Sequence, residues 1–173
     1  MRTKRFDKNL YKECDKTGKE LARLVFASLD PIHGQFVVVS SEEECSTDLV
    51  VDKLKDGRRT RFRVEVELCR NERNWQDRKF YYDKIHVPAR KTRYVEDDEW
   101  YIQFSPDQAE FGLVRCAAIN GAETEERAGR MPDGQVVDLD TYSNVPFKDW
   151  KWFKIVRSDA GVSVEQFYPR GQR

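Results

Sequence analysis

Three carboxylates stand in two apolar segments at a spacing that suits a metal ion. Asp48 opens a strand predicted at residues 48–54, while Glu65 and Glu67 lie inside a second strand predicted at residues 61–68. Side chains alternate faces along a strand, so the two glutamates point the same way with Cα atoms about 7 Å apart. Mg²⁺ needs only one or two carboxylates together with water. The sequence therefore predicts a site for Mg²⁺ or Mn²⁺, with Asp48, Glu65 and Glu67 as ligands.

The same residues have a second interpretation that needs no metal. A strand with one wet face often carries alternating charges that form cross-strand pairs. Arg61 and Arg63 share the face of Glu65 and Glu67, and they could neutralise the repulsion between the two carboxylates. Asp52 lies about 13 Å along the strand from Asp48, which is too far for both to bind one ion. The metal site and the wet face both stay open at this point.

Hydrophobic periodicity predicts the elements that would position these carboxylates. Apolar residues at helical spacing indicate a helix over residues 6–29, although Gly18 would allow two shorter helices. A strand at residues 35–40 follows, and then the two strands that carry the acidic residues. Asp56 and Gly57 are typical of a tight turn, so the latter two strands should form a hairpin.

The second half of the chain is predicted to consist mainly of strands. Residues 70–80 form a short helix or loop, and residues 84–91 an extended segment that Pro88 ends. Residues 120–134 are rich in Gly, Glu and Arg and are predicted to be a mobile loop. Further strands are expected at residues 100–104, 111–119, 135–139, 150–157 and 162–168. This order indicates a mixed α/β protein with a largely antiparallel start.

A helix, then three strands, with Asp48 opening the second strand and Glu-x-Glu in the third, resembles the PD-(D/E)XK nuclease superfamily over about residues 15–105. The resemblance implies an α/β (α+β) fold with a restriction-endonuclease-like αβββαβ core and a mixed sheet. It implies a nuclease core at residues 1–135, extended by a C-terminal β-hairpin at residues 136–173. The implied activity is Mg²⁺-dependent hydrolysis of phosphodiester bonds in DNA.

The resemblance also implies roles for individual residues. Asp48 and Glu65 correspond to the metal ligands, and Glu20 to an acidic residue of the first helix. Glu67 stands where the family usually has a lysine, so it would take the base role itself, or Lys91 would supply the positive charge. A catalytically inactive nucleic-acid-binding module on the same fold is the alternative that this departure favours.

Charge is unevenly distributed along the chain. Residues 58–93 contain 12 basic and 5 acidic side chains, whereas residues 94–140 contain 3 basic and 12 acidic ones. The basic segment is a candidate surface for a polyanion, and the alternative is that the two segments pair with each other. The acidic segment also suits a factor that mimics DNA towards a protein partner.

Contacts with nucleic acid are predicted within the basic segment, where aromatic side chains that stack on bases alternate with cations that bind phosphates. The residues concerned are Arg70, Arg73, Trp75, Arg78, Lys79, His86, Arg90 and Lys91. For residues 85–91 a structural turn with surface charge is the alternative. The predicted partner is DNA, with RNA and a homodimer left open.

Other features narrow the class of protein. A chain of 173 residues with 10 Phe, 7 Tyr and 4 Trp predicts one folded domain. Its first residues contain no apolar run and no later stretch has membrane-spanning length, so a cytoplasmic location is expected. The cysteines form no CxxC pair, which argues against zinc. Trp150 and Trp152 are predicted to pack in the core, and residues 96–99 to form a solvated acidic turn.

Overall fold

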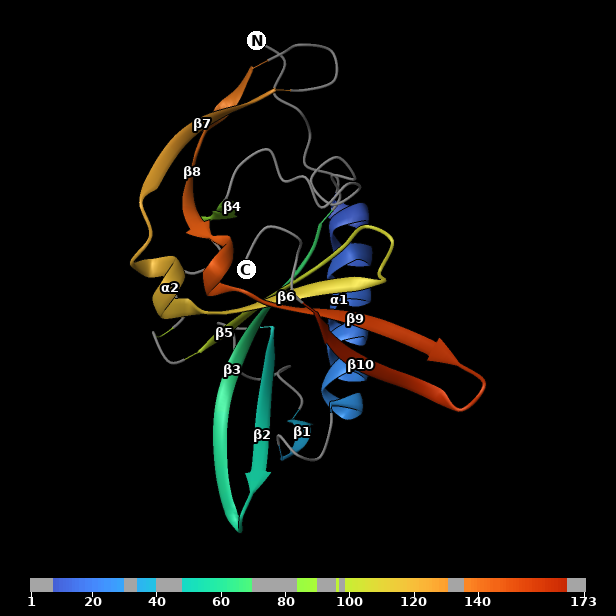
Figure 1. Ribbon diagram of the computed structural model, residues 1–173. Helices are drawn as coiled ribbons and strands as arrows, with labels where there is room; N and C mark the ends of the chain where they lie inside the picture. Colours follow the sequence, from blue (N-terminus) through green and yellow to red (C-terminus); the bar gives the residue numbers. More distant parts are fainter. Residues whose placement is uncertain are drawn as a thin grey trace.

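The computed structural model describes residues 8–29, 34–39, 48–69, 84–89, 96, 99–130 and 136–167, and it has a mixed α and β architecture (Figure 1). One sheet has seven strands in the order β1 (Gln35–Val39), β2 (Leu49–Lys55), β3 (Arg58–Leu68), β5 (Trp100–Phe104), β6 (Glu110–Arg115), β9 (Lys151–Ser158) and β10 (Gly161–Phe167). A second sheet has three strands in the order β4 (Lys84–Pro88), β8 (Val136–Pro146) and β7 (Thr124–Arg130).

The large sheet is mixed because one of its strand pairs is parallel. β3 and β5 run in the same direction, with Val64 beside Trp100 and Leu68 beside Phe104. The other neighbouring strands of this sheet are antiparallel. The β2–β3 hairpin turns at Asp56 and Gly57, which both have positive φ, as the predicted Asp-Gly turn requires.

Helix α1 (Lys8–Ser28) lies against one face of the large sheet as a single continuous helix. Gly18 does not divide it, and this residue lies where the helix packs against β3. A Cβ atom at Gly18 would lie 3.2 Å from a methyl group of Val66. The apolar side of the helix and this face of the sheet form one core, which we call the helix-side core. Its buried members include Leu21, Ala22, Val25, Phe26, Val64, Val66, Ile102, Phe111 and Phe153.

The opposite face of the large sheet packs against the small sheet and the short helix α2 (Cys116–Asn120). This second cluster, called the far-side core, joins strands of both sheets. Its members are Cys69, Ile85, Val87, Tyr101, Val114, Cys116, Ile119, Val145, Phe147, Trp150 and Trp152. Trp150 and Trp152 are therefore core residues, as predicted. A 3₁₀ turn, η4 (Phe147–Asp149), leads from β8 into β9.

Two predicted elements were wrong in type, and the short strand predicted at residues 135–139 continues to Pro146 as β8. The predicted strand at residues 111–119 ends at Arg115, and residues 116–120 form α2, whose Cys116 and Ile119 are buried. The predicted loop at residues 120–134 contains β7 (Thr124–Arg130), which pairs with β8. The sequence of this strand is charged and lacks the alternation of apolar residues by which strands are predicted. Its backbone nevertheless pairs with that of β8. Residues 70–80 lie outside the described residues.

Helices in the described part of the chain do not combine the length and apolar character needed to cross a membrane. This finding covers α1, which is long but carries charged side chains along much of its length.

Candidate active site

Asp48 lies beside Glu65 where β2 begins. The antiparallel ladder pairs Leu49 with Val64, so continuing its register by one residue places Asp48 opposite Glu65. A hydrogen bond supports this placement, because the backbone N–H of Val66 donates to Asp48 Oδ2 at 2.9 Å. Glu65 is only 8 % exposed. Two of the three predicted ligands therefore stand on adjoining positions of neighbouring strands.

A lysine from the helix reaches Asp48. Lys19 Nζ is 3.4 Å from Asp48 Oδ1, and it also donates a hydrogen bond of 2.9 Å to Asp15. Burial alone would lower the pKa of Lys19, but the hydrogen bond to Asp15 and the negative charges of Asp48 and Asp15 outweigh it, so the net pKa is raised. Lys19 is therefore a permanent cation beside Asp48 at neutral pH.

Glu67 occupies the next position on the same face of β3. The parallel register places Glu65 beside Tyr101 and Glu67 beside Gln103 of β5. Tyr101 is fully buried, and the side-chain oxygen of Gln103 is buried without a hydrogen-bond partner among the described residues. Buried amide oxygens normally have a donor, so this acceptor marks a place beside Glu67 where a water or another donor would be stabilised.

The groups that could bind a divalent cation here are the carboxylates of Asp48, Glu65 and Glu67. No group of three or more His, Cys, Asp and Glu side chains is arranged to hold a metal ion within the part of the chain that the structure describes. A full set of Asp48, Glu65 and Glu67 is thus not assembled there. Mg²⁺ requires only one or two carboxylates with water. Asp48 and Glu65, which stand opposite each other in the register, are the two carboxylates that such an ion would use, and a site for it stays a prediction.

The arginines on this face have other carboxylates as partners. Asp52 is 3 % exposed and accepts hydrogen bonds from Arg59 and Arg61, the latter at 2.9 Å. Arg63 lies 3.4 Å from Glu99, which is 5 % exposed. The sequence predicted a solvated acidic turn at residues 96–99. This prediction is wrong for Glu99, which is buried, whereas Glu96 is exposed. In these pairs the cations of the wet-face interpretation are bound to Asp52 and Glu99.

Glu20, the predicted helix acid, points away from Asp48. Its side chain is 59 % exposed and lies 3.9 Å from Lys16 on the same helix. Successive residues of a helix differ by about 100° in direction, so only one of Lys19 and Glu20 can face the sheet. The structure turns Lys19 inward. The sequence did not single out Lys19, because an Asp–Lys contact between a helix and a strand leaves no local pattern.

His86 is tied to the small sheet. It lies on β4, and its Nδ1 is 2.6 Å from the side-chain oxygen of Asn144 on β8. Because an amide oxygen can only accept, Nδ1 carries the proton in this hydrogen bond. Ile85 and Val87 on either side are buried in the far-side core. His86 therefore has a structural contact within strand β4 rather than in a turn, and its predicted contact with nucleic acid stays a prediction.

The remaining predicted contacts fall outside the described residues. They are Arg70, Arg73, Trp75, Arg78, Lys79, Arg90 and Lys91. The roles proposed for them, including that of Lys91 as a source of positive charge, stay predictions.

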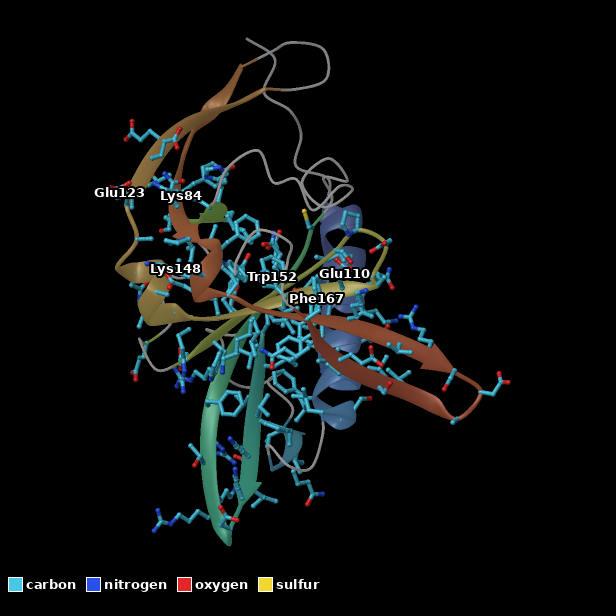
Figure 2. The ribbon with its side chains drawn as sticks, in the orientation of Figure 1. Lys84, Glu110, Glu123, Lys148, Trp152 and Phe167 are labelled. Carbon is cyan, nitrogen blue, oxygen red and sulfur yellow. The ribbon has the colours of Figure 1, made fainter. Side chains whose placement is uncertain are left out.

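Two ion pairs between described side chains join the basic and acidic segments of the chain. One is the pair of Arg63 and Glu99, and the other is Lys84 with Glu123, whose Nζ and Oε2 atoms are 3.2 Å apart (Figure 2). Both pairs join the segment at residues 58–93 to that at residues 94–140. Part of the charge asymmetry in the sequence is therefore compensated inside the fold.

No family model, curated protein or solved structure matches this chain. Its function must therefore be argued from its own residues.

Proposed function

We propose that this protein is a divalent-metal-dependent nuclease that hydrolyses phosphodiester bonds in DNA. The observation that carries the proposal is the position of Asp48, which stands opposite Glu65 in the β2–β3 register and contacts Lys19. Two carboxylates thus occupy adjoining positions of neighbouring chain segments, and an ammonium group from a helix lies beside one of them, Asp48. Carboxylates that bind a hard cation next to a fixed positive charge are suited to the transfer of a phosphoryl group.

The sheet topology supports the finer fold assignment, a restriction-endonuclease-like core. An α-helix is followed by three antiparallel strands, and the third pairs in parallel with a later strand, β5. The strand order β1-β2-β3-β5-β6 is the arrangement expected for that core with a mixed sheet. In this assignment β9 and β10 extend the core sheet, and β7 and β8 form an addition beside it.

Each residue of the site has a proposed role. Asp48 and Glu65 hold the cation, and Lys19 places positive charge where negative charge develops on the phosphate oxygens. Glu67 orients or deprotonates the attacking water, as its place beside Glu65 allows. When bound, a divalent cation lowers the pKa of a coordinated water and neutralises charge on the phosphate. Lys19 is thus a second proposed source of the missing positive charge, beside the predicted Lys91.

A non-catalytic nucleic-acid-binding module on the same fold is the second candidate. One observation favours it: the carboxylate of Asp48 already accepts the Val66 amide and contacts Lys19. In an inert protein these contacts would simply be structural. The two candidates differ in whether the site binds metal and cleaves DNA.

The test compares the thermal stability and the activity of three proteins. The unmutated protein should gain stability from millimolar Mg²⁺ or Mn²⁺, because the ion binds only the folded state. It should also nick or linearise plasmid DNA. Asp48→Asn and Glu65→Gln should each lose the metal-induced rise in melting temperature and the cleavage. Glu65→Gln should keep or raise the melting temperature without metal, because it removes charge repulsion.

Asp52→Asn is the matched control, because Asp52 is a buried carboxylate on the same strand as the site but is held by two arginines. It should unfold more easily yet keep the metal response and the cleavage. Metal-induced stabilisation without cleavage in the unmutated protein would favour the inert module. A melting temperature of the unmutated protein that does not change with either ion, with and without DNA, would overturn the proposal of a metal site.

A further inference from the structure

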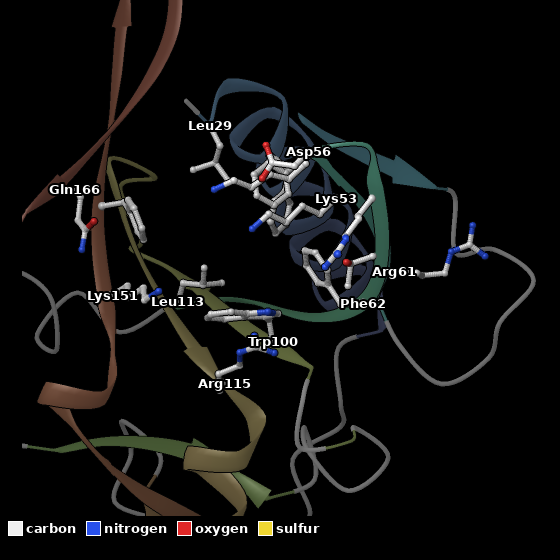
Figure 3. A pocket seen from close by; sticks show the side chains of 16 residues that line it. Leu29, Lys53, Asp56, Arg61, Phe62, Trp100, Leu113, Arg115, Lys151 and Gln166 are labelled. Atoms are coloured by element: carbon white, nitrogen blue, oxygen red, sulfur yellow. The ribbon is translucent and has the colours of Figure 1, made fainter. Parts of the chain in front are cut away.

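A pocket of about 780 Å³ lies on the helix side of the large sheet, between the β2–β3 hairpin and the β9–β10 hairpin (Figure 3). It is on the opposite face from Glu65 and Glu67. Arg58, Thr60 and Phe62 share the pocket-facing side of β3, and the long side chain of Arg61 also lines the pocket, whereas Glu65 and Glu67 do not. Trp100, which lies beside Val64 in the register, belongs to the pocket face of β5. The pocket is therefore distinct from the candidate active site.

The pocket exists because α1 covers only part of this face. The helix ends at Ser28, and Phe26 and Leu29 near its end form one wall. Beyond it the two hairpins continue without a helix above them (Figure 1). The volume lies within the range of small-molecule and cofactor sites, about 300–1,000 Å³.

Aromatic and aliphatic side chains form the floor. The indole of Trp100 lies across the pocket, with Arg115 on one side of the ring and Leu113 next to it (Figure 3). The Arg115 guanidinium carbon is 4.2 Å from the ring centroid, and Lys151 Nζ is 5.6 Å from it. On the other wall Phe62 packs near Phe36, and Lys53 Nζ lies 5.7 Å from the Phe36 ring. Flat apolar surfaces therefore alternate with cations.

The charge of the pocket is strongly positive. Six basic side chains line it, and Asp56 is the acidic residue among its described lining. Arg61 is already paired with Asp52. For Lys53, Lys55, Arg58 and Lys151 no ion pair with a described carboxylate is formed. These cations stand on both walls, on β2, β3 and β9, so they can meet more than one anionic group.

We propose that this pocket binds single-stranded nucleic acid. A base stacks on the aromatic floor at Trp100, and the phosphates on either side of it meet the cations of the two hairpins. Because cations stand on both walls, the pocket can bind several successive phosphates at once. A nucleic-acid strand should therefore bind more tightly than a free nucleotide with one phosphate group. A duplex keeps its bases stacked inside, so it could not place one on Trp100. The inference does not require hydrolysis at Asp48 and Glu65.

The test is binding of the full chain to a fluorescently labelled oligothymidylate of about 12 nucleotides, which covers one typical site. Measurements are made in EDTA, so that metal binding and cleavage play no part. Lys53→Gln/Lys151→Gln should weaken binding about tenfold, and lower the slope of log affinity against log salt by about 0.7 for each phosphate that the variant no longer binds. Trp100→Leu should weaken binding about tenfold through weaker stacking, with little change in that slope.

Lys148→Gln is the control for charge, because Lys148 is an exposed cation at η4, away from both hairpins (Figure 2). It should bind like the unmutated protein. The lysine variants change exposed or half-exposed side chains, so the proposal can be tested even if Trp100→Leu fails to fold. Equal binding by Lys53→Gln/Lys151→Gln and Lys148→Gln would overturn the proposal. Duplex DNA of the same length, or thymidine monophosphate, that binds as tightly as the oligonucleotide would overturn the single-strand assignment. Failure of metal binding or cleavage at Asp48 and Glu65 would leave this test unaffected.

Discussion

Two aspartates, Asp48 just before β2 and Asp52 within it, illustrate how a carboxylate is committed to one role by its immediate partners. Asp52 lies between the guanidinium groups of Arg59 and Arg61, whereas Asp48 is held by the Val66 amide and Lys19. Guanidinium groups are weakly hydrated and match carboxylates bidentately, so Asp52 is tightly engaged in a structural contact. The contacts of Asp48 with the Lys19 ammonium group and a backbone amide lack this bidentate geometry.

The first prediction at this scale concerns Asp52 and pH. Hydrogen bonds from Arg61 and then Arg59 hold the pKa of Asp52 well below its ordinary value, despite the opposing effect of burial. The unfolded chain therefore binds the proton more readily, and the stability from this group is fully present above about pH 4 and is lost as the pH falls through the lower folded value. Asp52→Asn should thus unfold at lower urea concentration than the unmutated protein at pH 7.

The difference in urea midpoint between the two proteins should narrow steadily below about pH 4. Glu96→Gln is a suitable comparison, because Glu96 is an exposed acidic residue. It should leave the urea midpoint close to that of the unmutated protein at pH 7. A difference for Asp52→Asn that stays constant from pH 7 to pH 3 would contradict the ion-paired state of Asp52.

At the scale of elements, β6 shows how one strand accommodates two tryptophans. Gly112 lies opposite Trp152 in the ladder, and its missing side chain leaves room for Trp150. A Cβ atom at Gly112 would lie 2.7 Å from the Trp150 ring and 3.2 Å from that of Trp152. Both rings are buried and stacked against each other, with centroids 5.8 Å apart. The strand can therefore carry no side chain at this position without displacing them.

Gly112→Ala should accordingly destabilise the protein by about 1–3 kcal/mol, the usual cost of overpacking a core. The free energy of unfolding from urea titration is the measurement. In a Trp150→Leu background the same substitution should cost less, because the nearest ring is gone and the two sites are coupled. An equal cost in both backgrounds would show that crowding by Trp150 is not the cause.

At the scale of the whole molecule, the far-side core joins the two sheets. Tyr101 and Trp152 belong to strands of the large sheet, and Trp150 directly precedes β9. Val87 and Val145 belong to the small sheet. The chain also crosses between the sheets more than once, since β4 lies between β3 and β5 in sequence and β8 leads through η4 into β9. Shared burial and repeated crossing should make the two sheets unfold together.

Val87→Ala tests this coupling, because Val87 is fully buried on the small sheet. It should lower the free energy of unfolding by about 0.5–3 kcal/mol. Tryptophan fluorescence, which includes the buried Trp150 and Trp152 of the large sheet, should report the same shifted urea midpoint as far-UV circular dichroism. A shift seen by circular dichroism with an unchanged fluorescence midpoint would show that the small sheet unfolds separately.

Local sequence patterns determined many of the elements of this protein. The helix at residues 6–29, the hairpin with its Asp56-Gly57 turn, and the hairpin at residues 150–168 follow from periodicity and turn chemistry. The same patterns placed Glu65 and Glu67 on one face of β3. These features depend on residues within a few positions of one another, where backbone geometry dictates the outcome.

Only the tertiary structure decided which side chains meet. Lys19 rather than Glu20 contacts Asp48, and Arg63 forms an ion pair with the buried Glu99. The residues that line the pocket at Trp100 are spread along the chain from Phe26 to Gln166, so no local sequence pattern predicts the pocket. Such contacts depend on strand order, register and the point where α1 ends. They come from the packing of distant segments, which periodicity and turn signals along the chain do not encode.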